Sequence, residues 1–221
     1  MNYLLSESEN HKWELETLKT NVVVRVASTA KYLVNPKSAD DHNKAGLELV
    51  EIGLYQEAIM EFEQAVRRRS DFAEAYFNEG VAYDLLTLHS NAIKCYERAI
   101  RVKPDYAEAY NNLGVAHGKL GQGVAAIIAC VKAVGIRPNY INALNNLGHA
   151  YYDLGKYAEA MRACNKVFQL NLRDVQARYL MGLIHIDLGN KEAAEREQQT
   201  LQEIDSSTAI QLRDTIRRNF R

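Results

Sequence analysis

The 221-residue sequence contains few of the residues that break or cross-link a chain, with three prolines and three cysteines. The cysteines are odd in number and form no Cys-x-x-Cys pair, so we expect free thiols, a reducing compartment and no metal site. No apolar run approaches the roughly 18 residues that cross a bilayer. The formal net charge is −1, so no basic field attracts nucleic acid. We expect a cytoplasmic protein without an integral membrane segment, and peripheral attachment to a membrane or large complex stays open.

Small residues recur along the chain at a fixed interval of 34 residues, with no insertion or deletion. The first series is Gly46, Gly80, Gly114, Gly148 and Gly182. An alanine follows each glycine by twelve positions, at Ala58, Ala92, Ala126, Ala160 and Ala194. A period of this length is typical of stacked helix pairs, in which small residues let two antiparallel helices approach closely. A further series, seven positions after each glycine, suits the left-handed turn that ends a helix: Gly53, Thr87, Gly121, Gly155 and Gly189.

The repeated unit also has a recognisable order of residue types. Its best copy reads Tyr76, Gly80, Tyr83, Ala92, Tyr96, Ala99 and Pro104. This pattern resembles the tetratricopeptide repeat (TPR). The resemblance implies an all-α fold, a right-handed superhelical solenoid of antiparallel helix pairs. Five units are expected within residues 39–208, at 39–72, 73–106, 107–140, 141–174 and 175–208.

The segments outside the five units are predicted to close the array. Pro36 lies two periods before Pro104, so residues 1–38 are interpreted as an N-terminal helical segment with a degenerate repeat. Its apolar stripe follows helical spacing: Leu15, Leu18, Val22, Val26, Ala30 and Leu33. Three interpretations stay open for this segment: a cap on the first unit, an arm docked on a neighbouring subunit, or a helix on a membrane surface. Residues 209–221 are predicted to form a C-terminal capping helix.

The sequence shows no constellation that predicts catalysis or a cofactor. Cys130 and Cys164 occupy the repeat position of Phe62 and Tyr96, which predicts buried packing residues. The turn at residues 121–123 lacks the strand and the lysine of a phosphate-binding loop. We therefore predict a protein that is not an enzyme and needs no cofactor.

The candidate binding residues follow from the TPR resemblance, which implies that the first helix of each pair lines a concave groove. Carboxamides recur there, and each offers one acceptor and two donors to an extended peptide. A similar asparagine ladder occurs in the TPR region of O-GlcNAc transferases. The alternative is that asparagine merely suits a solvated helix face. The predicted peptide-binding residues are Lys44, Asn78, Asn111, Asn112, Lys119, Asn145, Asn146 and His149.

Two functions stay open. The first is an adaptor that binds a protein or peptide partner in the groove through this ladder. The second is a self-assembling scaffold, a homo-oligomer in which the N-terminal helix of one copy docks into the groove of the next. The length and the degenerate leading unit resemble the TPR proteins that coat bacterial magnetosomes. A clamp for chaperone tails is disfavoured, because Glu108 and Asn112 stand where that clamp requires basic residues.

Overall fold

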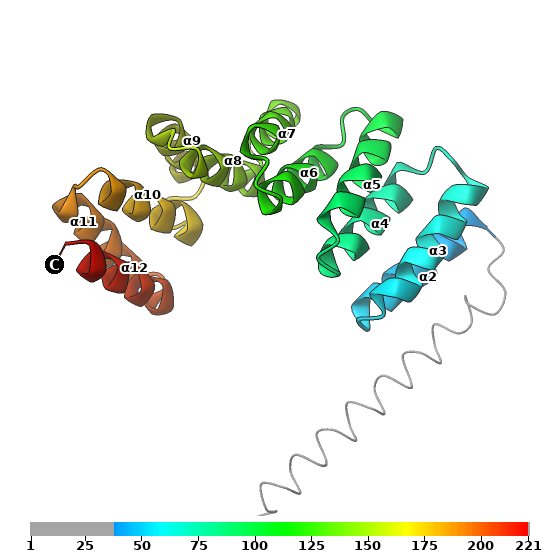
Figure 1. The fold of residues 1–221 in the computed structure, drawn as a ribbon, viewed down its shortest axis with the longest axis horizontal. Coiled ribbons are helices and arrows are strands. Elements are labelled where there is room, and N and C mark those ends of the chain that lie inside the picture. Colours follow the sequence, from blue (N-terminus) through cyan, green and yellow to red (C-terminus); the bar gives the residue numbers. More distant parts are fainter. Residues whose placement is uncertain (1–37, 221) are drawn as a thin grey trace, which may run out of the picture. The chain divides into compact units, whose positions relative to one another are not determined.

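The computed structural model describes residues 38–220, which form eleven α-helices joined by short turns and contain no β-strand (Figure 1). The predicted all-α fold is confirmed. Ten of the helices follow as antiparallel pairs: α2 (Ala39–Glu51) and α3 (Tyr55–Arg68), α4 (Ala73–Leu85) and α5 (His89–Val102), α6 (Ala107–Lys119) and α7 (Gly123–Ile136), α8 (Ile141–Asp153) and α9 (Tyr157–Leu170), and α10 (Val175–Asp187) and α11 (Lys191–Gln202). The last helix of the described range is α12 (Ser206–Asn219). Each predicted repeat from 39 to 208 thus contains one pair.

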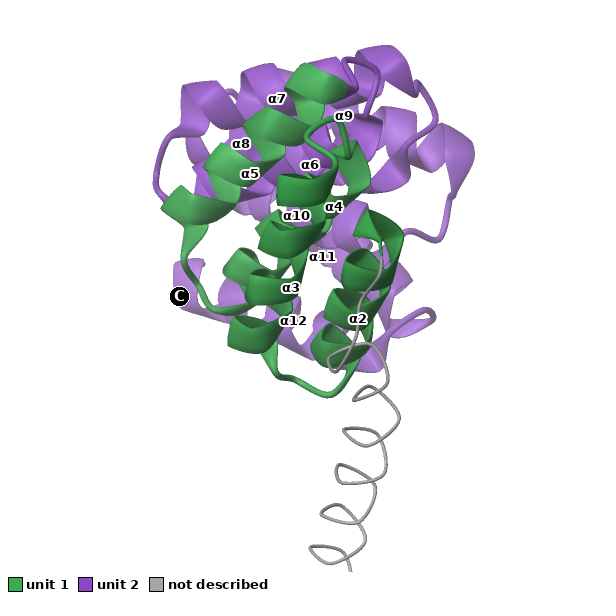
Figure 2. Cartoon of the chain, turned by 90° about the vertical axis from the view of Figure 1, so that its right-hand side faces the viewer, with its two compact units in different colours: residues 1–102 green, residues 103–221 purple. Residues whose placement is uncertain are grey.

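The chain divides between residues 102 and 103 into two compact units (Figure 2). Unit 1 contains α2 to α5, and unit 2 contains α6 to α12. Within each unit every helix packs against the next one along the chain, and α10 also contacts α8 and α12. The repeat pattern runs through residue 102 without a change, so the sequence did not predict this division.

The recurring glycines Gly46, Gly80 and Gly114 lie where the two helices of a pair touch, whereas a Cβ atom on Gly148 would first meet Leu180 of α10, at 3.0 Å. A Cβ atom built on Gly46 would lie 2.5 Å from a ring carbon of Phe62, and one on Gly80 would lie 2.6 Å from the ring of Tyr96. Both rings are fully buried. The glycine therefore leaves the space that a large side chain of the second helix fills, which confirms the predicted close approach.

The second series of small residues ends the first helices in left-handed turns, as predicted. The φ angles of Gly53, Gly121, Gly155 and Gly189 lie between 67° and 81°. Thr87 takes the same conformation, with φ of 59°, and no other non-glycine residue of the described range has a positive φ. The turn geometry is thus kept even where the glycine is missing.

The C-terminal helix α12 packs against α10 and α11. A Cβ atom on Gly182 would lie 2.5 Å from a methyl carbon of Leu212, so Leu212 fills the place that an aromatic residue fills in the first two pairs. The predicted boundary between residues 208 and 209 falls inside α12. The helix begins earlier because the side chain of Asp205 accepts hydrogen bonds from the amides of Ser207 and Thr208.

The three cysteines are free and buried. Cys130 and Cys164 are each 1% exposed, which confirms the prediction that they are buried, and this burial raises the pKa of both thiols to about 12. Across residues 38–220, each helix is too short or too polar to cross a membrane. The same range holds no group of three His, Cys, Asp or Glu side chains placed to bind a metal. The predictions for residues 1–37 lie outside the described residues.

Candidate functional site

A pocket of about 310 Å³ opens between α6 and α8, the first helices of two neighbouring pairs in unit 2. Small and apolar residues form much of its lining: Gly114, Val115, Gly118, Ala126 and Ala150. The polar residues of the lining are Lys119, Asn146, His149 and Asp153. Three of the predicted peptide-binding residues, Lys119, Asn146 and His149, therefore meet in one pocket. Its volume is at the lower end of the range for ligand pockets, roughly 300–1,000 Å³.

The pocket exists because α6 has a glycine where the other first helices carry larger side chains. Gly118 corresponds by the 34-residue repeat to Val50, Asp84, Tyr152 and Ile186. A Cβ atom built on Gly118 would meet no other atom within 4 Å, so its side faces open space. Gly114 is different, because a Cβ there would lie 2.5 Å from the sulfur of Cys130. Gly114 serves helix packing, whereas Gly118 leaves a void.

The polar groups give the pocket a neutral interior and a charged rim. His149 is half-buried, and burial lowers the pKa of its imidazole, an effect that the charge of Asp153 partly offsets. At neutral pH the imidazole is therefore uncharged and carries one donor and one acceptor. Lys119 and Asp153 are both exposed and opposite in charge. The pocket is thus suited to an uncharged side chain.

The asparagines beside the pocket bond to one another. The Nδ2 of Asn146 donates to Oδ1 of Asn111 at 2.8 Å, and in unit 1 the Nδ2 of Asn78 donates to Oδ1 of Asn43 at 3.0 Å. Both bonds span 35 residues, one more than the repeat. The same link between neighbouring first helices therefore recurs in both units. The sequence ladder at intervals of 34 did not predict these partners.

Asn111 and Asn145 are buried and engaged within the protein. Asn111 donates to Oδ1 of Asn112 at 3.1 Å. Asn145 donates to Oδ1 of Asp174 at 3.1 Å, and Asp174 in turn caps the first turn of α10. Asn145 therefore links α8 to the start of α10, and Asn111 links α6 to α8 through the bond that it accepts from Asn146. The donors of both carboxamides are directed at other side chains.

Two carboxamide atoms on the first-helix face of unit 2 keep their hydrogen-bonding capacity. The Nδ2 of Asn112 has no acceptor within the described range, since this residue only accepts a bond from Asn111. The Oδ1 of Asn146 likewise has no donor there, because this residue donates only through Nδ2. Neither atom is among the buried polar atoms that lack a partner. Together they offer one donor and one acceptor, the pair that a peptide group requires.

The remaining predicted site residues, Lys44 and Asn78, lie on α2 and α4 of unit 1. Lys44 is exposed, and Asn78 is half-buried through its bond to Asn43. The eight predicted residues are therefore divided between the two units. The pocket gathers three of them, all in unit 2.

Models of TPR families match most of the chain. One described as "TPR repeat" matches residues 89–121, and others described as "Tetratricopeptide repeat" match residues 43–89, 107–140, 141–173 and 175–208. Together they cover residues 43–208 except 174. The chain belongs to the tetratricopeptide repeat family. Its repeats identify it as a protein-interaction module.

Solved structures share this fold. The crystal structure of YrrB, "a TPR protein with an unusual peptide-binding site", has a TM-score of 0.68 and 21% identity, and the match covers 84% of this chain and 97% of that chain. The crystal structure of MamA has a TM-score of 0.69 and 23% identity, with 74% and 96% covered. A thermophilic TPR protein from Thermus thermophilus has a TM-score of 0.62 and 18% identity, with 83% and 99% covered. No curated protein matches the sequence. At these identities the likeness shows the fold alone.

Proposed function

We propose that this TPR protein binds an extended peptide segment of a partner protein along the first-helix face, without catalysis. The pocket at Gly118 carries the proposal, because it is an open, mostly apolar site on the face where three predicted binding residues meet. One uncharged side chain of the peptide enters the pocket. If that side chain ends in a polar group, the neutral imidazole of His149 is available to form a hydrogen bond with it.

The peptide backbone is held beside the pocket by the two available carboxamide atoms. Asn112 Nδ2 donates to a peptide C=O, and Asn146 Oδ1 accepts from a peptide N–H. Asn111 and Asn145 act indirectly, since their hydrogen bonds fix the orientation of Asn112 and the spacing of α8 and α10. Asn78 and Lys44 belong to unit 1, and for that unit they are proposed to contact a peptide on its own first-helix face.

The test begins with a random peptide library displayed on phage and selected on the full chain. Selected peptides are then synthesised, and their dissociation constants are measured by fluorescence polarisation. Gly118→Leu fills the pocket, so binding should weaken by at least about tenfold. The matched control is Gly135→Leu, which adds the same side chain to a helical glycine whose Cβ also meets open space, but on α7 and outside the pocket.

The outcomes separate the two functions predicted from the sequence. Peptides that bind the wild type and Gly135→Leu equally, and Gly118→Leu weakly, support peptide binding in the pocket. A library that yields no binder, or binders indifferent to Gly118→Leu, contradicts it. The scaffold alternative is tested in the same assay with a synthetic peptide of residues 11–35, because docking of the N-terminal helix into a neighbour's groove requires this peptide to bind and Gly118→Leu to weaken it.

A further inference from the structure

Helix α7 leaves an apolar stripe uncovered on the side that faces away from α6 and α8. Val124, Ile128 and Val131 are 64%, 59% and 46% exposed. With Gly135 they recur at intervals of four, three and four residues, which places them on one face of the helix. Ala133, on the opposite side, is fully buried in unit 2. An exposed stripe of this kind on a folded protein is typical of an interaction surface.

The other second helices are an internal comparison, because the 34-residue repeat gives each of them the same four outward positions. Every one of them carries at least one charged residue there. The residues are Gln56, Met60, Glu63 and Arg67; Ser90, Lys94, Glu97 and Arg101; Ala158, Arg162, Asn165 and Gln169; and Glu192, Arg196, Gln199 and Glu203. Helix packing therefore does not require apolar residues at these positions. The stripe of α7 is a feature of this helix alone among the second helices described.

We propose that this stripe is a self-association surface, at which two copies of the chain pair their α7 helices antiparallel. The spacing of four, three and four reads the same in both directions, so Val124 of one copy meets Gly135 of the other and Ile128 meets Val131. At each end of the paired stripes, the branched side chain of Val124 thus faces Gly135, which has no side chain. Open space around the Cβ position of Gly135 gives the partner's Val124 room.

The lack of charge on the stripe favours a second copy as its occupant. Lys132 is the one charged residue of α7, and it lies beside the stripe. Removing a charge from water without a partner is costly, so an uncharged stripe matches a partner surface that is itself uncharged. Among the described second helices, only α7 presents such an outer face. The second copy therefore provides the surface of matching chemistry.

The exposed apolar area of the stripe determines how strongly two copies are expected to associate. Three partly exposed aliphatic side chains amount to apolar surface on the order of a few hundred Å² per copy, against about 800 Å² per partner in a standard interface. The dimer is therefore weak and dissociates on dilution. It is also separate from peptide binding, because the pocket is lined by Ala126 on the buried side of α7.

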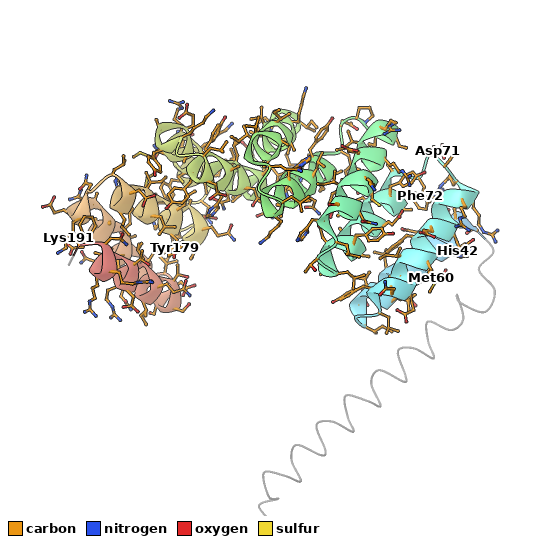
Figure 3. The ribbon with its side chains drawn as sticks, in the orientation of Figure 1. His42, Met60, Asp71, Phe72, Tyr179 and Lys191 are labelled. Atoms are coloured by element: carbon orange, nitrogen blue, oxygen red, sulfur yellow. The ribbon has the colours of Figure 1, made fainter. Side chains whose placement is uncertain are left out.

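Sedimentation velocity of the full chain tests the proposal between about 10 and 500 µM, the range in which a small interface associates. The weight-average mass should rise from the 25.0 kDa of one chain toward twice that value. Ile128→Arg, which introduces the residue type of Arg162, should abolish the rise. Met60→Arg is the matched control: Met60, labelled in Figure 3, holds the same repeat position on α3 and is 56% exposed, and its replacement should leave the rise unchanged.

The glycine variants form a crossed test against the peptide site. Gly135→Leu places a side chain where the partner's Val124 packs and should weaken association, whereas Gly118→Leu should not. A bismaleimide cross-linker should join Val124→Cys to Gly135→Cys in a mixture, and should join Val124→Cys to itself far less. A wild type that stays monomeric up to 500 µM (about the upper limit for so small an interface) overturns the proposal. Association that survives Ile128→Arg, or that is lost in Gly118→Leu alone, also overturns it.

Discussion

At the residue scale, Thr87 occupies a turn position that is better suited to glycine. Its φ is 59°, whereas glycine takes this left-handed conformation in the four equivalent turns. A side chain in this region costs roughly 1–2 kcal/mol, and a β-branched one is the least tolerated. We predict that Thr87→Gly raises the free energy of unfolding by about 1 kcal/mol, after the greater entropy of glycine in the unfolded chain is deducted. Urea denaturation measures this change.

The reverse substitution provides the control for Thr87. A Cβ on Gly121 would meet no atom within 4 Å, so Gly121→Thr adds backbone strain without a clash. It should lower the free energy of unfolding by about 1 kcal/mol, because the lower entropy of threonine in the unfolded chain offsets part of the strain. Equal stability of Gly121→Thr and the wild type would show that the turn tolerates a β-branched residue.

Glu79 is a buried carboxyl on α4 whose Oε2 has no hydrogen-bond partner. Burial raises its pKa, and the neighbouring thiol of Cys95 offsets part of this effect. Because its pKa in the folded state lies above the unfolded value of 4.5, the folded state binds more protons. The stability that the folded state gains by binding this proton on Glu79 is fully present below pH 4.5 and is lost as the pH rises through the pKa of Glu79 in the folded state.

We therefore predict that Glu79→Met, which introduces the residue of the equivalent position Met181, stabilises the protein at pH 8 by about 1–3 kcal/mol. The stability difference from the wild type should shrink as the pH falls toward 4.5. Urea denaturation across this range measures it, with Glu79→Gln as a variant of similar shape that does not titrate. A difference that does not change with pH would show that Glu79 is not the titrating group.

At the scale of the helices, the sequence predicted the pairs and their turns, because close approach and left-handed geometry each demand a particular residue type. It did not predict the asparagine partners, because a hydrogen bond joins the nearest side chains, and these lie 35 residues apart instead of 34. It did not predict the pocket either, although it predicted three of the lining residues as binding residues, Lys119, Asn146 and His149. Gly118 is one of several small residues in α6, and the sequence does not show which of them faces a void.

Helix α12 closes unit 2 through Leu212, which is fully buried beside Gly182. We predict that Leu212→Ala lowers the free energy of unfolding by about 2–5 kcal/mol, because it leaves a cavity between α10 and α12. Ile210→Ala removes similar atoms from an exposed position of the same helix and should cost well below 1 kcal/mol. Thermal and urea unfolding of the two variants compare them. If Leu212→Ala lowered the free energy of unfolding as little as Ile210→Ala does, α12 would contribute little packing to unit 2.

At the scale of the whole molecule, the chain divides into two compact units, and within each unit every helix packs against the next one along the chain. In repeat proteins the stability is a sum of local terms, so a local defect should stay local. Gly80→Ala forces a Cβ against the ring of Tyr96 in unit 1 and should cost about 1–3 kcal/mol there. Hydrogen exchange followed by mass spectrometry should then accelerate roughly tenfold within residues 39–102 and stay unchanged from 141 to 219.

Leu212→Ala should give the opposite distribution, with faster exchange in α10 to α12 and an unchanged exchange rate in α2 to α5. Acceleration of both units by either variant would show that the array unfolds as one cooperative body, because a defect in one unit would then lower the stability of every helix.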